Sequence, residues 1–139
     1  MMRMAKRKKQ TLFKAKKKEA TAQASIRAGK GVIRINSRNL DYFEPAQLKA
    51  LIMEPVFLAG DAAKGVNISV RVEGSGPMSQ AVAARGAIAK SLVEFTGDEK
   101  LRKIYLEYDR MLLVDDPRRV EPKKPLGPKA RKKKQHSKR

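Results

Sequence analysis

The chain has 139 residues, 41% of them hydrophobic, and a formal net charge of +19, so it has room for one compact domain and needs an anionic partner. It has no cysteine and a single histidine, which excludes a disulfide framework and a zinc ribbon. The apolar stretch at residues 50–60 is too short to cross a bilayer, and no apolar signal segment follows the basic residues 1–9. We expect a nucleic-acid-binding protein without metal, cofactor or membrane partner.

The basic residues gather at the two ends of the chain. Residues 1–30 hold 11 basic and 1 acidic residue, residues 31–116 hold 11 and 12, and residues 117–139 hold 11 and 1. A near-neutral core with two cationic arms is typical of a protein whose arms thread between the phosphates of a large folded RNA. We therefore predict a basic extension over residues 1–18, a globular domain over 19–116 and an extended basic tail over 117–139.

The first two predicted strands form a hairpin. Alanine and isoleucine alternate with polar residues over residues 20–28, a period of two that indicates a strand. Residues 29–31 supply a glycine-rich turn, and residues 32–35 supply a second short strand. The small alanines permit close packing against a helix.

A helix is predicted next, with Glu44 as its cap, Pro45 at its first position and Pro55 beyond its end. Residues 66–73 then alternate strictly between apolar and polar side chains, which is the clearest strand pattern in the chain. The chain therefore combines helices and strands.

Two further helices follow. One begins at Pro77 and has an apolar face that runs to Phe95 and a closing glycine at Gly97. The other spans residues 98–109 with Asp98 as its cap. The pattern predicts an α/β (α+β) domain in which helices cover one small sheet.

Two sequence features could indicate a nucleotide-binding or a catalytic site, but each has a simpler explanation. Residues 74–76, Gly-Ser-Gly between strand and helix, resemble a phosphate-cradling loop, but a plain strand-to-helix turn explains the glycines as well. His136 lies in the basic tail, where no core could fix a catalytic geometry. We therefore expect no enzyme.

Asp115 and Asp116 form an adjacent carboxylate pair that could hold Mg²⁺. Arg118 and Arg119 stand close by in the sequence and would compensate the two negative charges. We favour a salt-linked turn.

Arg85 falls on or beside the apolar face of its predicted helix, so some group should pair with it. It could be a salt-bridged arginine, with Glu73 or an aspartate of the later loop as partner, or it could reach an RNA phosphate at the helix edge. Both interpretations stay open on the sequence alone.

Several ordered motifs resemble one family. Residues 73–81 (EGSGPMSQA), 83–85 (AAR), 87–92 (AIAKSL), 116–124 (DPRRVEPKK) and 137–139 (SKR) closely resemble the ninth small-subunit ribosomal protein, in its archaeal and eukaryotic form. The resemblance runs from about Ala15 to Arg139. It implies a small two-layer sandwich with a left-handed β-α-β crossover, an exception to the usual right-handed rule, plus extended basic N- and C-terminal arms.

The resemblance also implies a function. It implies a structural protein of the cytoplasmic ribosome that binds ribosomal RNA in the head of the small subunit, beside neighbouring head proteins, with no small-molecule substrate. The end of its tail is expected to contact the transfer RNA in the peptidyl site through Ser137, Lys138 and Arg139. The basic residues expected to face ribosomal RNA are Lys16, Lys17, Lys18, Arg85, Arg110, Arg118, Arg119, Lys123, Lys124, Arg131, Lys132, Lys133 and Lys134.

Two other functions are weighed against this one. The chain could be a free-standing basic nucleic-acid binder, such as a chromatin or antitermination factor, or it could be an RNA-processing enzyme or small-molecule kinase on a related fold. A chromatin-type protein needs no ordered motifs in its core, and an enzyme needs a nucleophile, a metal cluster or a complete phosphate loop.

Overall fold

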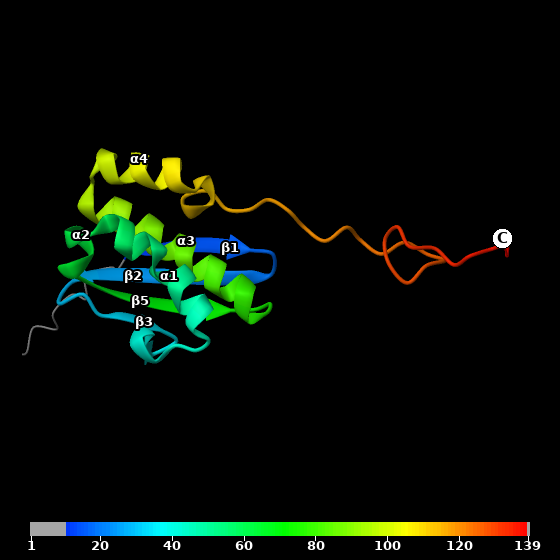
Figure 1. The fold of residues 1–139 in the computed structure, drawn as a ribbon, viewed down its shortest axis with the longest axis horizontal. Helices are drawn as coiled ribbons and strands as arrows, with labels where there is room; N and C mark the ends of the chain where they lie inside the picture. Colours follow the sequence, from blue (N-terminus) through cyan, green and yellow to red (C-terminus); the bar gives the residue numbers. More distant parts are fainter. Residues whose placement is uncertain (1–10, 139) are drawn as a thin grey trace, which may run out of the picture.

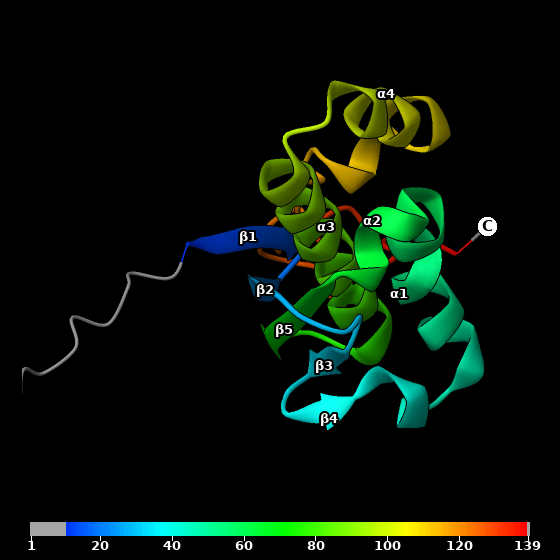
Figure 2. The same ribbon diagram turned by 90° about the vertical axis from the view of Figure 1, so that its left-hand side faces the viewer.

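The computed structural model describes residues 11–138, which form a five-stranded sheet with helices packed against one face (Figures 1 and 2). The strand order is β1-β2-β5-β3-β4. The strands are β1 (Leu12–Lys17), β2 (Ala20–Ala28), β3 (Ile33–Ile35), β4 (Arg38–Asn39) and β5 (Val66–Glu73). The helices are η1 (Leu40–Tyr42), α1 (Ala46–Ala59), α2 (Asp61–Lys64), α3 (Pro77–Thr96), α4 (Glu99–Tyr108) and η2 (Arg110–Leu112). The predicted mixed class is confirmed.

The predicted hairpin between residues 20–28 and 32–35 is wrong, although both segments are strands. β2 pairs antiparallel with β5 from Thr21 to Ala28, and β5 separates it from β3. The long partner satisfies far more backbone groups of β2 than the three residues of β3 could. The turn after β2 is held by β5 instead, because the side-chain oxygen of Asn67 accepts hydrogen bonds from the backbone N–H groups of Lys30 and Val32.

The sheet begins before residue 19. Residues 12–17 form the edge strand β1, although they were predicted to belong to the basic extension. β1 pairs with β2 from Leu12 opposite Ser25 to Lys17 opposite Ala20. Ala15 at the centre of β1 is buried against α3, which gives this lysine-rich segment an apolar anchor. The extension is therefore shorter than predicted, and residues 1–10 lie outside the described residues.

β3 and β5 run parallel and are joined by a crossover that contains β4, η1, α1 and α2. Parallel strands need such a connection because a tight turn can join only antiparallel neighbours. The left hand that the family resemblance implies for this crossover stays a prediction.

Helix α1 starts later and ends later than predicted. Pro45 is its N-cap instead of its first residue, and the helix continues through Pro55 to Ala59. A proline inside a helix removes one backbone hydrogen bond. Pro55 is buried, and the hydroxyl of Tyr105 on α4 donates a 2.7 Å hydrogen bond to the Pro55 carbonyl, which holds this part of α1 against α4. Burial raises the pKa of Tyr105 far above its usual range, so this hydroxyl stays a donor.

The strand at residues 66–73 and the two later helices are confirmed. α3 ends at Gly97, whose left-handed backbone lets its N–H reach the carbonyl of Val93. α4 is capped by the side chain of Asp98, as predicted. Within residues 11–138, no helix combines the length and apolar character needed to cross a bilayer.

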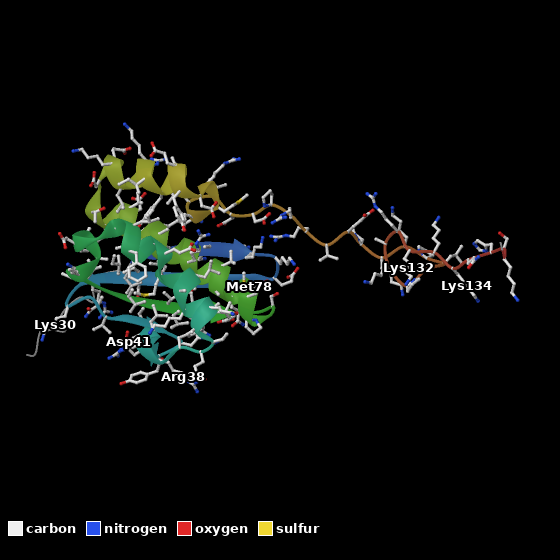
Figure 3. All side chains as sticks on the ribbon, in the orientation of Figure 1. Lys30, Arg38, Asp41, Met78, Lys132 and Lys134 are labelled. Carbon is white, nitrogen blue, oxygen red and sulfur yellow. The ribbon has the colours of Figure 1, made fainter. Side chains whose placement is uncertain are left out.

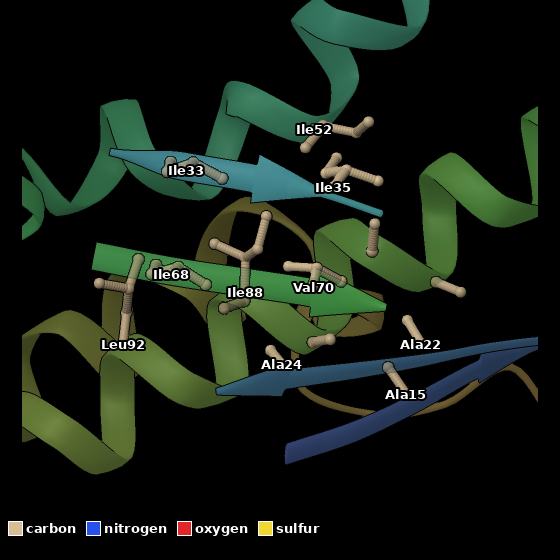
Figure 4. Packing of buried hydrophobic residues seen from close by; sticks show 14 of the residues in the cluster. Ala15, Ala22, Ala24, Ile33, Ile35, Ile52, Ile68, Val70, Ile88 and Leu92 are labelled. Carbon is tan, nitrogen blue, oxygen red and sulfur yellow. The ribbon is translucent and has the colours of Figure 1, made fainter. Parts of the chain in front are cut away.

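The core lies between the sheet and helices α1 and α3 (Figure 4). Four alanines on β1 and β2 face α3, and branched side chains of β3, β5 and α1 fill the wider part of the layer. Because the alanines are small, α3 approaches the sheet closely: a Cβ atom on Gly86 would lie 3.2 Å from the Cβ of Ala15. This close approach confirms the packing expected from the alanine pattern.

Candidate nucleic-acid interface

The tail leaves the domain at Asp116, a carboxylate with only 5% of its side chain exposed. Arg118 donates three side-chain hydrogen bonds of 2.7–3.0 Å and one from its backbone N–H to this carboxylate. Lys17 of β1 forms an ion pair with it from the other side. Arg118 first and Lys17 second hold the pKa of Asp116 far below its usual range, so the carboxylate is ionised at neutral pH.

Asp115 and Arg119 add further links between this segment and the domain. Asp115 accepts a 2.7 Å bond from Lys90 of α3 and a longer one, 3.4 Å, from the backbone N–H of Lys16. Arg119 donates a 2.8 Å hydrogen bond to the Lys18 carbonyl. We call Asp115, Asp116, Arg118 and Arg119 the tail anchor. The predicted salt-linked turn is confirmed for Asp116 and Arg118. Asp115 binds β1 and α3 instead, and Arg119 binds Lys18 in the turn after β1.

Replacing Asp116 with Asn should loosen the start of the tail, because the neutral amide keeps the shape but loses both ion pairs. Amide hydrogen exchange at Arg118 should become roughly tenfold faster. The same change at Asp115, whose side chain is 44% exposed, should have a smaller effect and is the matched control. Since the pKa of Asp116 is lowered on folding, its contribution is complete above about pH 4 and is lost as the pH falls further. Equal exchange in both variants would contradict the anchoring role.

Arg85 lies in the interior, with 9% of its side chain exposed, between two carboxylates. It pairs with Glu54 of α1 at 2.5 Å and with Asp109 after α4 at 2.9 Å. Burial alone would raise the pKa of Asp109, but the backbone N–H of Met111 and the Arg85 guanidinium together lower it. The structure favours the salt-bridged interpretation, with Glu54 and Asp109 as partners in place of Glu73.

Beyond the anchor, the tail runs away from the domain without helix or strand, and Figure 3 shows Lys132 and Lys134 far from the sheet. It is not extended throughout. Glu121 pairs with Lys124 at 3.3 Å and with Arg131 at 2.9 Å, so the chain between them forms a loop, visible in Figure 1. Glu121 is the single acidic residue after Asp116, which explains why the basic segment folds back toward it.

The other basic residues predicted to face RNA are exposed on the surface. Within residues 11–138, no carboxylate lies within ion-pair distance of any member of this group. Its members are Lys16, Lys18, Arg110, Lys123, Lys132, Lys133 and Lys134. At the tail end, Ser137 and Lys138 are exposed, and Arg139 lies outside the described residues.

The backbone explains one glycine of the loop between β5 and α3. Gly74 has a φ of +80°, and a Cβ atom on it would lie 2.5 Å from the Glu19 carbonyl oxygen. A strand-to-helix turn therefore accounts for the glycine that resembled a phosphate loop. Among residues 11–138, no group of three or more acidic or histidine side chains could hold a metal ion.

Known proteins are similar to this chain over nearly its whole length. A family model described as "Ribosomal protein S9/S16" matches residues 15–139. The chain belongs to the ribosomal protein S9/S16 family. The "Small ribosomal subunit protein uS9" of Methanococcus vannielii is 45% identical over 125 residues, which cover 87% of this chain and 93% of that protein. The protein of the same name from Methanococcus maripaludis strain C7 is 44% identical with the same coverage.

Membership in the S9/S16 family confirms the predicted resemblance, including its archaeal character, because both relatives come from Methanococcus. It also confirms that the chain is not an enzyme, since the family consists of ribosomal proteins. The hypotheses of a chromatin factor and of an RNA-processing enzyme or kinase are therefore set aside.

Sequence reasoning missed two features of this S9/S16 chain. Lys90 and Lys17 are tied to the tail, although only their contacts across the fold reveal it. Arg27 of β2 and Arg34 of β3 both lie on the sheet face opposite the helices. The period-two alternation around Arg27 and Arg34 was the signal that could have shown this, because a strand places alternate residues on one face.

Proposed function

We propose that this chain is a structural constituent of the small ribosomal subunit that binds ribosomal RNA in the subunit head and contacts peptidyl-site transfer RNA with its tail. Membership in the S9/S16 family supports the structural role, and the names of the Methanococcus relatives support the small subunit. Its partners would be ribosomal RNA, transfer RNA and neighbouring head proteins. No membrane or small-molecule substrate takes part.

The tail anchor is the observation that carries the proposal. It joins a nearly neutral domain to a strongly basic segment through Asp116, a buried carboxylate bound from two sides. A tail that needed only to be solvated would require no such attachment. An anchored tail can enter RNA in a defined direction, because its first residues are fixed against β1 and α3.

We assign the ribosomal RNA contacts by exposure. The exposed basic residues without an ion pair within residues 11–138 are the first candidates, and those of the tail would neutralise phosphates without reading bases. Arg118 can contribute as well, since 79% of its side chain remains exposed beside Asp116. Arg85 is left out, because Glu54 and Asp109 already neutralise it in the interior.

The same physical logic applies to the tail tip. A cation at the end of a long arm can neutralise the phosphates of an anticodon stem, and such a contact serves every transfer RNA alike because it reads no base. Ser137, Lys138 and Arg139 are the proposed contact residues. In this proposal the chain divides into a short basic extension, a domain from β1 to residue 116 and a tail from 117 to 139.

Removing the charges of the tip tests the transfer RNA contact. Small subunits rebuilt with Lys138→Ala and Arg139→Ala should assemble normally and bind peptidyl-site transfer RNA roughly two- to tenfold more weakly, since each exposed charge contributes modestly. The variant with Arg102→Ala and Lys103→Ala on the exposed surface of α4 loses the same charge and should keep its transfer RNA affinity. Equal affinities for the tip variant and the unaltered chain would show that the tip is only a solvated end.

A further inference from the structure

Among residues 11–138, no element covers the sheet face opposite the helices. Helices α1, α2, α3 and α4 lie on the other side of the sheet, as Figure 2 shows. Strand alternation and register put one set of exposed or partly exposed side chains on this open face. The set consists of Leu12, Lys14, Lys16, Thr21, Gln23, Ser25, Arg27, Arg34, Asn67, Ser69, Arg71 and Glu73.

The open face is strongly basic. It carries five basic side chains and one acidic side chain, and the acidic one, Glu73, is already paired with Arg71 at 2.7 Å. Among residues 11–138, Lys14, Lys16, Arg27 and Arg34 form no ion pair. The face therefore presents four uncompensated cations on rigid strands.

A hollow lies between two of these cations. Arg27 of β2 and Arg34 of β3 line it together with Ser25, Asn67 and Ser69. Its volume of about 490 Å³ is within the range of pockets that hold drug-sized molecules, and it is open to solvent. Asn67 also fixes the turn beside the hollow by accepting the two backbone hydrogen bonds of residues 30 and 32. The hydroxyls and guanidiniums thus lie on a frame that is already ordered.

We infer that this open sheet face is a docking surface for the sugar-phosphate backbone of double-stranded RNA, with Arg27 and Arg34 binding one phosphate group in the hollow. The inference rests on the proposed function, since it assigns a part of the RNA-binding surface that lies outside the two arms. Guanidiniums bind phosphate through paired N–H groups, and serine hydroxyls can donate to phosphate or ribose oxygens.

The chemistry of the face favours RNA duplex over other partners. A protein interface would be expected to have exposed aromatic or bulky apolar anchors at its centre. The two apolar residues that line the hollow are Val32, which is partly buried, and Ile68, which is buried, and the other lining residues are serine, asparagine and arginine. Single-stranded RNA would need aromatic side chains on which bases stack, and the open-face residues include none. Duplex RNA presents phosphates and 2′-hydroxyls on a regular surface, which suits polar donors on a rigid sheet.

A charge-matched pair of variants tests the inference. The full-length chain carrying Arg27→Gln and Arg34→Gln should bind archaeal small-subunit ribosomal RNA with a salt slope lowered by about 1, the loss of one phosphate contact. The control carries Arg102→Gln and Lys103→Gln on α4, loses the same charge and should retain the salt dependence of the unaltered chain. Both variants must keep the unaltered unfolding midpoint. Equal slopes for both would overturn the inference, and failure of the unaltered chain to bind this RNA would instead overturn the proposed function.

A second measurement uses the absence of cysteine from the chain. An iron chelate attached at Ser69→Cys should cleave duplex ribosomal RNA at a few discrete positions in rebuilt small subunits, because Ser69 lies in the hollow. The same chelate at Lys103→Cys should not cleave those positions. Loss of discrete cleavage from Ser69→Cys in particles that assemble normally would overturn the inference by a route independent of binding strength.

Discussion

Raising monovalent salt from about 50 to about 200 mM should weaken binding of the full-length chain to ribosomal RNA outside the particle by about 10³- to 10⁵-fold, if 6 to 10 phosphates are contacted. The physical reason is that each neutralised phosphate releases condensed counterions, and added salt reduces that gain. Filter binding at a series of salt concentrations measures the slope, and thereby the number of contacts.

A shortened chain that ends at Val120 separates the contribution of the tail from that of the domain. It keeps the tail anchor and loses nine basic residues. The slope should fall in proportion to the tail contacts, and the remaining slope should come from the domain. An unchanged slope would contradict the role of the tail as an RNA-binding arm.

Replacing Arg85 with Met should lower the free energy of unfolding by about 2–3 kcal/mol at neutral pH. Removing one partner of a buried ion pair costs about 3–5 kcal/mol, and we reduce this because the side chains of Glu54 and Asp109 are 29% and 36% exposed. Methionine fills a similar volume, so the loss comes from two carboxylates left without their cation. Urea unfolding of the full-length chain measures the effect.

Two further observations decide whether Arg85 acts inside the domain. The loss should shrink as the pH falls toward about 4, because Arg85 helps to lower the pKa of Asp109 and this contribution to stability disappears as that carboxylate is protonated. Arg102→Met on the exposed surface of α4 should change stability by no more than about 0.5 kcal/mol. Folded Arg85→Met should bind RNA with an unchanged salt slope, whereas a lost phosphate contact would lower the slope by about 1.

Local patterns were sufficient for much of the fold. The alternation in residues 66–73 identified β5, and Pro77, Gly97 and Asp98 marked the ends of α3 and α4. These predictions succeed because strand alternation, helix caps and chain-breaking glycines act between residues that are neighbours in sequence. The division of the chain into a globular domain and basic arms can also be predicted from the sequence, because a charged segment with few apolar residues cannot form a core of its own.

The partners of these elements could not be predicted in the same way. β2 pairs with β5 instead of β3, β1 joins the sheet through Ala15, and α1 runs through Pro55, whose carbonyl binds Tyr105 of α4. Each outcome depends on residues far apart in the chain, whose contacts leave no periodic trace in the sequence.

The same distinction between sequence and tertiary structure holds for the charged residues. The positions of the charged residues along the sequence were enough to predict a neutral domain with cationic arms, because the net charge of a segment depends only on which residues it contains. Which of those cations remain available to RNA depended on folding: Lys17 meets Asp116 across 99 positions, and Arg85 meets Glu54 and Asp109 in the interior. An ion pair forms where the folded backbone brings opposite charges within a few ångströms, and burial strengthens it by excluding water.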